Sequence, residues 1–286
     1  MRWQESRRSD NVEDQRGSSF GGKPVALGGG GLLVLLLISL IFKVNPLTLL
    51  EGVNANVDSP GVSGSVTPGS PAEEKMKDFV SAVLGETEDV WSDVFARSGK
   101  TYRRPKLVLF SGMVQSACGT AETASGPFYC PGDEKVYLDM SFFNELSQKL
   151  GAPGDFAQAY VIAHEIGHHV QKQLGINQKV EEMQSRSSRA RANELSVRLE
   201  LQADFLAGVW AHYAQERMSI LEAGDLEEAL NAASSVGDDR IQKQSQGYVV
   251  PDAFTHGTSE QRARWFRLGF ETGDMARGDT FSANPL

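Results

Sequence analysis

The sequence is 286 residues long, 40% of them hydrophobic, with 28 Lys or Arg against 37 Asp or Glu. This length suits one large domain or two small ones. The formal net charge of −9 and the isoelectric point near 5.2 argue against nucleic acid as a partner, because phosphate binding requires a basic surface. The charge is uneven: residues 1–44 carry six basic and four acidic side chains, a balance of +2, which leaves −11 for the rest.

The amino-terminal quarter of the chain changes character twice. Residues 1–24 are polar and rich in Arg, Ser and Gly, which predicts a disordered segment. The run 25–42 (VALGGGGLLVLLLISLIF) then holds 18 residues without a charge. That is near the lower limit for a spanning helix, and we expect a membrane anchor over residues 25–44. The alternatives are a buried core helix and a cleaved signal peptide, although the small-x-small site at 53–55 lies far beyond the apolar run.

Charge and cysteines predict where the chain resides. Lys and Arg are concentrated before the apolar run, so we expect a cytoplasmic amino terminus and a single crossing. In a bacterium this is an inner-membrane protein with its main domain in the periplasm. A disulfide between Cys118 and Cys130 would fit that oxidising compartment. Two reduced, buried thiols in the cytoplasm are the alternative.

Residues 45–71 are expected to form a disordered linker, and residues 72–286 the folded domain. A first helix begins at Pro71 and is expected to end at Gly85, with Thr87 capping a second one. Two short strands are predicted at 106–110 and 135–139, separated by a long loop over 111–131. Further helices are expected at about 156–174, 194–211 and 225–246, and after a capping box at 258–261.

The central motif is His-Glu-x-x-His. In a helix His164 and His168 lie on one face and can bind one Zn²⁺, while Glu165 can reach a metal-bound water. The surrounding apolar residues predict a buried helix, in which such groups need partners. A surface helix with incidental His and Glu is the alternative. His169 lies about 100° away round the helix and is expected to be structural.

A catalytic zinc site needs a third ligand and leaves a position for water. The pattern His-x-x-Gly-x-x-His is excluded, because Gln171 and Leu174 stand where it needs Gly and His. Glu200 fits best, since Asp204 follows four residues later and can accept the other N–H of a ligating histidine. Glu194 and His212 are weaker rivals.

These residues predict peptide hydrolysis. Zinc acidifies a water, Glu165 takes its proton and later passes it to the leaving amine. His256 is the first candidate for a donor to the oxyanion, ahead of Tyr248 and Arg262, and a surface-loop histidine is the alternative. The strand 135–139 could pair with an extended substrate.

The chain resembles the bacterial neutral zinc metallopeptidase family over nearly its whole length. The residues that carry the resemblance are the runs 1–4 (MRWQ), 9–14 (SDNVED), 126–131 (GPFYCP), 136–139 (VYLD), 164–171 (HEIGHHVQ), 200–204 (ELQAD) and 208–210 (GVW). The resemblance implies a zincin-like α+β fold, predominantly helical with a short sheet, together with single-pass membrane attachment and proteolysis. The ELQAD run and the His256 segment also resemble membrane-bound heat-shock and prenyl-protein proteases. Those proteins have several spans, so their substrates do not transfer.

Two functions are therefore expected. The first is a membrane-anchored endopeptidase with one Zn²⁺ per chain, a protein or peptide substrate, and lipid contact through residues 25–44. The second is a non-catalytic, membrane-anchored scaffold or interaction protein with a structural zinc.

Overall fold

The computed structural model describes residues 1–17 and 69–286. The expected anchor, residues 25–44, lies outside the described residues, as does the expected linker up to residue 68. No helix within the described ranges has the length and apolarity that crossing a membrane requires. Residues 1–17 and 71–286 together form one compact unit.

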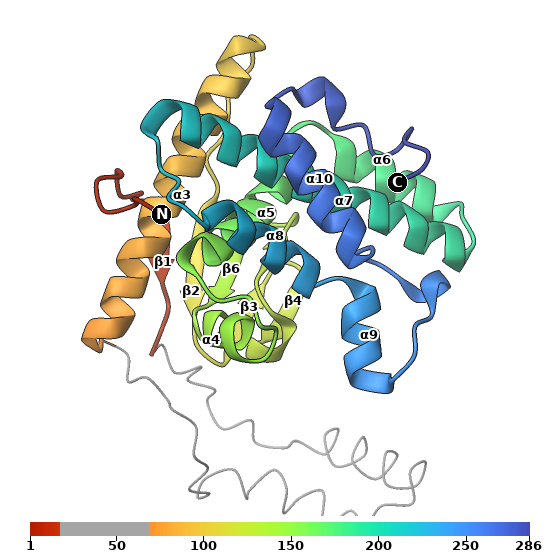
Figure 1. The fold of residues 1–286 in the computed structure, drawn as a ribbon, viewed down its shortest axis with the longest axis horizontal. Helices are drawn as coiled ribbons and strands as arrows, with labels where there is room; N and C mark the ends of the chain where they lie inside the picture. Colours follow the sequence, from red (N-terminus) through yellow and green to blue (C-terminus); the bar gives the residue numbers. More distant parts are fainter. Residues whose placement is uncertain (18–68) are drawn as a thin grey trace, which may run out of the picture. The chain divides into compact units, whose positions relative to one another are not determined.

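A four-stranded sheet lies on one side of this unit, with the strands in the order β1-β2-β6-β5 (Figure 1). Three strands run parallel, namely β1 (Val12–Asp14), β2 (Lys106–Phe110) and β6 (Lys135–Asp139). The fourth strand, β5 (Phe128–Cys130), is antiparallel to β6 and forms one edge. The prediction of strands at 106–110 and 135–139 is confirmed.

The predicted long loop over 111–131 is wrong. A hairpin of β3 (Met113–Ser116) and β4 (Gly119–Glu122) occupies it, a 3-10 turn η2 (Thr123–Ser125) follows, and β5 comes next. The strands are only three or four residues long and contain small polar residues, so their alternation is too short to stand out from a loop.

Successive residues of β2 face two different cores. Leu107 and Leu109 join the large core shared with the helices. Val108 and Phe110 point to the other face, where they join a smaller core with Val114 of β3. The period of two in strand side chains explains this division. The hairpin therefore covers one face of the sheet and the helices cover the other.

Helices make up most of the described chain, which confirms the predominantly helical α+β prediction. They are α3 (Pro71–Arg97), α4 (Ser141–Gln148), α5 (Asp155–Gln173), α6 (Ile176–Ser185), α7 (Arg189–Met218), α8 (Asp225–Ser235), α9 (Asp238–Gln246) and α10 (Ser259–Thr272), with 3-10 turns η3 (Pro251–Ala253) and η4 (Met275–Arg277). The predicted capping box is present at the start of α10.

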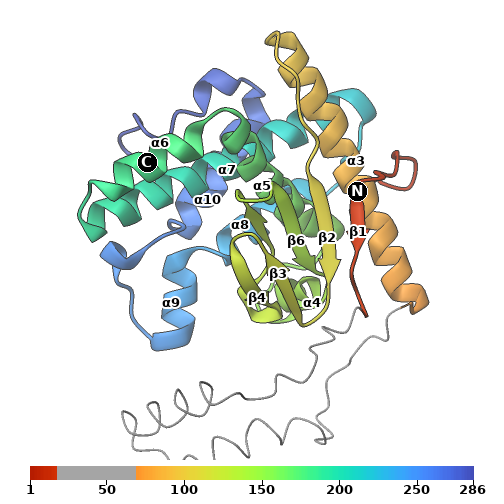
Figure 2. The same ribbon diagram turned by 180° about the vertical axis from the view of Figure 1, so that it is seen from behind.

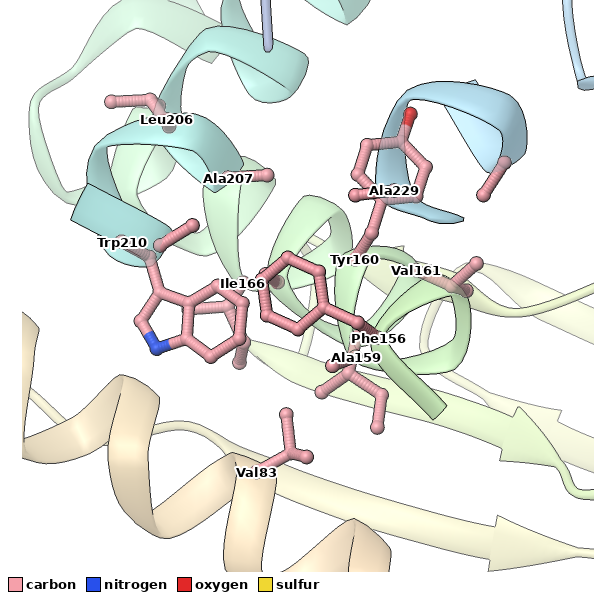
Figure 3. Close-up of a cluster of buried hydrophobic side chains, with 14 of the residues drawn as sticks. Val83, Phe156, Ala159, Tyr160, Val161, Ile166, Leu206, Ala207, Trp210 and Ala229 are labelled. Atoms are coloured by element: carbon pink, nitrogen blue, oxygen red, sulfur yellow. The ribbon is translucent and has the colours of Figure 1, made fainter. Parts of the chain in front are cut away.

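Helix α5 runs through the middle of the large core. Phe156 of α5 stacks on Trp210 of α7 with ring centroids 5.9 Å apart, and Val83 of α3 approaches from below in the view of Figure 3. All three side chains are essentially inaccessible to solvent. Burial on this scale stabilises each such side chain by about 1.5–3 kcal/mol. The predicted burial of the helix is confirmed.

Two glycines allow the central helices to approach closely. A Cβ on Gly167 of α5 would lie 2.9 Å from the Ala203 carbonyl oxygen of α7. A Cβ on Gly208 of α7 would lie 2.0 Å from the Phe266 carbonyl oxygen of α10. Any larger residue would push these backbones apart. The two contacts bring α5, α7 and α10 together beside the predicted site.

Two predicted helix boundaries are wrong. Gly85 does not end a helix, because α3 continues through it to Arg97. Its missing Cβ instead leaves room for the backbone of Arg7, whose carbonyl oxygen would lie 2.4 Å from a Cβ there. The predicted helix 225–246 is two helices, because Gly237 interrupts it where the chain passes the backbone of Ser259.

The prediction that residues 1–24 are disordered is wrong for residues 1–17, which we call the N-terminal segment. β1 pairs with β2, and Figure 2 shows β1 at the edge of the sheet, next to α3. Met1 and Trp3 are buried, and the Trp3 ring meets Phe79 of α3 edge to face at 5.4 Å. The amino group of Met1 lies 2.7 Å from Asp155 at the start of α5.

Polar contacts explain why the composition of the N-terminal segment wrongly predicts disorder. Glu88 of α3 is fully buried and accepts hydrogen bonds from Ser9 and Asn11, and an ion pair from Arg7. Arg8 binds Asp78 through both ends of its guanidinium, each at 2.7 Å. The polar residues of the segment are therefore interface residues. Their partners lie about seventy positions along the chain, beyond the reach of a local pattern.

We expect Trp3→Ala to lower the free energy of unfolding of the full chain by about 3 kcal/mol, because it removes a buried aromatic side chain and leaves a cavity. Denaturant unfolding followed by circular dichroism measures this. The control is Gln4→Ala at the exposed neighbouring position, which should change stability by less than about 0.5 kcal/mol. Equal stability of the two variants would mean that the N-terminal segment does not belong to the folding unit.

Candidate metal centre

Three side chains from two helices converge at the middle of α5. His164 and His168 project from α5 and Glu200 from α7, and their ligand atoms all lie within 4.8 Å of one another. Nε2 of His164 is 3.2 Å from one Glu200 oxygen, and Nε2 of His168 is 3.4 Å from the other. Both histidines thus present the same ring nitrogen to one point.

This arrangement fits a zinc ion. Zinc–nitrogen and zinc–oxygen bonds of about 2.0–2.2 Å in a tetrahedral site place neighbouring ligand atoms about 3.4 Å apart. The separations of 3.2 and 3.4 Å match that spacing. Two nitrogens and one carboxylate also form a donor set typical of catalytic zinc, which keeps a fourth position for water.

Each histidine is oriented through its other nitrogen. Nδ1 of His164 donates to Asp204 at 2.8 Å, one helical turn beyond Glu200 on α7. Nδ1 of His168 donates to the side-chain oxygen of Gln171 at 2.9 Å, and Gln171 is fixed by the Leu199 carbonyl. These bonds set the tautomer that leaves Nε2 free for a metal.

Asp204 is itself held by two residues whose contact with it the sequence analysis missed. The Arg262 guanidinium of α10 binds both oxygens, at 2.8 and 3.0 Å, and the Tyr160 hydroxyl donates at 2.5 Å. All three side chains are buried. Arg262 was proposed as an oxyanion donor, but this ion pair engages its guanidinium. Tyr160 lies one helical turn before His164, so the two side chains share one face of α5. This spacing is the signal in the sequence that links Tyr160 to the site.

Charge balance favours the protonated histidines when no metal is bound. Burial lowers the pKa of His164, but the Asp204 charge and the hydrogen bonds to Asp204 and Glu200 outweigh it and raise that pKa to about 10. Burial also lowers the pKa of His168, but the charge of Glu200 and its hydrogen bond outweigh burial, so the pKa of His168 is raised. Burial would raise the pKa of Glu200, yet the two histidines hold it well below its usual range. Without a metal, the carboxylates therefore favour protons on the imidazole rings, and a cation that binds there would replace these protons.

Glu165 lines the same cleft as the three converging residues, but burial has the largest effect on its pKa. It is 8% exposed and lies among the residues that line the cleft. Burial raises its pKa, and the neighbouring histidines oppose that rise. A carboxylate with an elevated pKa is a better proton acceptor near neutral pH.

The metal-binding group lies in an open cleft of about 440 Å³. One wall is the edge strand β5 with the residues before it, and the other is formed by residues around α9 and by His256. The predicted pairing of a substrate with strand 135–139 is wrong, because β6 lies between β2 and β5 and both of its edges are used. β5 is the strand whose outer edge borders the cleft.

His256 lines this cleft opposite α5, with half of its side chain exposed. Asp238, the first residue of α9, accepts a hydrogen bond from its Nδ1 at 3.0 Å. The same carboxylate accepts three backbone N–H groups, from residues 255, 256 and 257. The hydrogen bond to Asp238 raises the pKa of His256, which favours an imidazolium with Nε2–H as a further donor.

The structure places the rival residues away from the cluster. Glu194 pairs with Arg191 and Arg198 near the surface. His212 bonds to the Phe270 carbonyl. His169 contacts the Tyr129 hydroxyl and the Arg103 carbonyl, as expected for a structural residue. Tyr248 is 62% exposed and is not among the residues that line the cleft.

The predicted disulfide between Cys118 and Cys130 is present. It joins the turn of the β3–β4 hairpin to the last residue of β5. Cys130 is fully buried in the smaller core. The bond therefore ties the edge strand beside the cleft to the hairpin that covers the sheet.

Comparison with known proteins gives one family. Residues 1–281 match the family model described as "Putative neutral zinc metallopeptidase". The chain is 51% identical to "Uncharacterized protein YpfJ" of Escherichia coli (strain K12) over 289 aligned positions, which cover 98% of this chain and 99% of that protein. It is 42% identical to "Uncharacterized protein Rv2575" of Mycobacterium tuberculosis over 228 positions, 76% of this chain and 75% of that one. No solved structure matches.

We expect zinc binding to the metal-free protein at pH 7.5 to release protons, because zinc displaces them from the imidazole rings. The pKa of His164 is about 10, so this ring is protonated at this pH, and the pKa of His168 is also raised, whereas the metal requires both rings neutral. Calorimetric titration in two buffers of different ionisation enthalpy counts these protons.

The control is the same titration of Glu194→Gln, at a surface carboxylate away from the cluster, which should release the same number of protons. A binding enthalpy at pH 7.5 that does not depend on the buffer would contradict the assigned ligands.

Proposed function

Because the chain belongs to the neutral zinc metallopeptidase family, we propose that it is a zinc-dependent endopeptidase acting on protein or peptide substrates. One observation carries the proposal: His164, His168 and Glu200 converge beside Glu165 at an open cleft. A purely structural zinc needs neither the cleft nor a carboxylate with a raised pKa next to it.

The three converging residues would hold one zinc ion per chain. When bound, zinc supplies a Lewis acid that acidifies a water and polarises the substrate carbonyl. Asp204 and Gln171 keep the two imidazole rings oriented with Nε2 toward Glu200. Arg262 balances the buried charge of Asp204, which would otherwise be costly.

Glu165 acts as the general base and then as the general acid. Its carboxylate takes a proton from the attacking water and passes it to the nitrogen of the leaving amine. The raised pKa supports both roles, because the carboxylate must accept and release the proton near neutral pH. Burial also limits competing proton exchange with bulk water.

His256 donates a hydrogen bond to the oxyanion that forms at the attacked carbonyl. Asp238 orients the ring through Nδ1 and favours its protonated form by raising its pKa, which leaves Nε2–H directed away from Asp238. Activity is therefore lost as the pH rises through the raised pKa of His256.

The cleft favours internal peptide bonds. An exopeptidase needs a charged group that binds a terminal carboxylate or amine. Within the described part of the cleft lining, the charged groups already have other roles: Asp204 engages Arg262, Glu165 and Glu200 face the metal position, and His256 faces the oxyanion. The outer edge of β5 offers backbone groups to an extended substrate instead.

We expect Glu165→Gln to keep one zinc per chain and to lower kcat for cleavage of an unfolded protein by about 10²–10⁴, because it removes only the proton acceptor. Zinc content by atomic spectroscopy and release of peptides from casein measure the two effects. Glu194→Gln, at the surface carboxylate, should change neither. A wild-type protein that binds zinc and cleaves nothing would favour the non-catalytic scaffold.

We propose an extracytoplasmic location with membrane attachment through residues 25–44. The disulfide between Cys118 and Cys130 supports an oxidising compartment. The apolar composition of residues 25–42 supports contact with lipid. In a bacterium the compartment would be the periplasm.

The contacts of the N-terminal segment argue against a single crossing. Arg16 binds Glu74 at 2.9 Å and Asp14 binds Lys77 at 2.9 Å, so the described residues that precede residue 18 and follow residue 70 lie side by side. A chain that crossed a bilayer once between these ends could not form β1 pairing or these ion pairs within one molecule. We therefore propose that residues 1–17 and 71–286 share one side of the membrane.

We expect a membrane-impermeant maleimide to label Gln4→Cys and Lys243→Cys variants equally in intact spheroplasts. Both positions are exposed, and the native cysteines are engaged in the disulfide. Labelling after lysis is the control for reactivity. Labelling of Lys243→Cys alone before lysis would restore the single crossing, and labelling of neither would contradict the extracytoplasmic location.

A further inference from the structure

Exposed apolar side chains are concentrated on one segment beside the cleft. Among the described residues, seven large hydrophobic side chains are exposed, and four of them lie within ten positions of one another. They are Ile241 of α9 and Tyr248, Val249 and Val250 of the following stretch, with exposed fractions from 38 to 62%. We call these four residues the α9 patch.

The backbone of this stretch is held in place while its side chains face solvent. The N–H of Val250 donates to the Gln242 side chain at 2.8 Å, and the Gln246 side chain donates to the Tyr248 carbonyl at 3.2 Å. The stretch therefore folds back along α9. Asn193 of α7 fixes its far end through the Asp252 carbonyl at 2.8 Å. The apolar side chains are not needed to secure this conformation.

The patch adjoins the cleft through one of its four residues. Ile241 belongs to both, since it lines the cleft together with Val236. The opposite wall is also apolar, with Pro127, Phe128 and Phe142. An extended chain bound in the cleft contacts Ile241, and the other three residues of the patch lie on the stretch that folds back along the same helix.

We propose that the α9 patch binds apolar side chains of an extended polypeptide substrate, several residues from the bond that is cut. The inference rests on the proposed endopeptidase function and specifies its substrate class as unfolded, apolar-rich polypeptide. Folded proteins bury such side chains, whereas unfolded ones present them along an extended chain. The patch thus selects for unfolded chains without requiring a particular sequence at the scissile bond.

The test is binding of fluorescently labelled casein, an unfolded apolar-rich protein, to the full chain carrying Glu165→Gln. Fluorescence anisotropy gives Kd without turnover. Adding Tyr248→Ser and Val250→Ser should raise Kd about tenfold, because two apolar contacts are lost. Adding Met218→Ser, a similarly exposed apolar side chain at the end of α7, should leave Kd unchanged.

A Kd that the patch substitutions leave unchanged would overturn the inference, as would undetectable casein binding. A change in oligomeric state by light scattering, with casein binding unchanged, would also overturn it, because the patch would then contact a second copy of the chain. Zinc content of the patch variant, equal to that of the parent, checks that the metal centre is intact.

Cleavage separates this inference from the function on which it rests. With Glu165 intact, the patch substitutions should raise KM for casein about tenfold and leave cleavage of a hexapeptide unchanged, because Tyr248 and Val250 lie outside the cleft that binds a hexapeptide. Equal losses on both substrates would overturn the inference. Casein that binds through the patch but is never cut would support patch binding and contradict the endopeptidase function.

Discussion

The carboxylate of Asp204 is the group on which the geometry of the metal centre depends. It is completely buried and receives hydrogen bonds from Tyr160 and His164 of α5 and from Arg262 of α10. A buried carboxylate is costly unless it is fully paired, so these groups are stable only when three helices meet in one register. That register turns Nε2 of His164 toward Glu200, one helical turn from Asp204. The orientation of the first ligand is thus a property of the core.

Close backbone contact makes this register attainable. Glu200 can reach both histidines only because α7 lies against α5, and Gly167 permits that approach at Ala203. Gly208 performs the same role between α7 and α10. Since packed cores tolerate little added volume, a methyl group at either glycine would move the ligands relative to one another. At these two positions, the packing of the core therefore also sets the distances between the candidate metal ligands.

Whether a feature could be predicted from the sequence depends on how far apart along the chain its residues lie. His164 with His168, and Glu200 with Asp204, are pairs at i and i+4, so helical geometry alone placed each pair on one face. The box at 258–261 is equally local. The ion pair of Arg262 with Asp204 and the burial of Trp3 against Phe79 join positions far apart, and no local pattern marks them. Local composition consequently predicts disorder for the polar N-terminal segment and a loop for the edge strand β5.

Helix α9 carries both Ile241 of the proposed substrate-binding patch and Asp238, which orients His256. Its first residue, Asp238, uses one carboxylate to hold three backbone N–H groups and the ring of His256. Its exposed face carries Ile241, and the stretch that folds back on it carries the rest of the α9 patch. A polypeptide bound as we propose would therefore be positioned by the same short helix that orients His256, the proposed oxyanion donor. On the other wall, the disulfide to Cys130 fixes β5. Because both walls are tied down independently of the substrate, the cleft is preorganised for an extended chain, and the cost of ordering falls on the substrate alone.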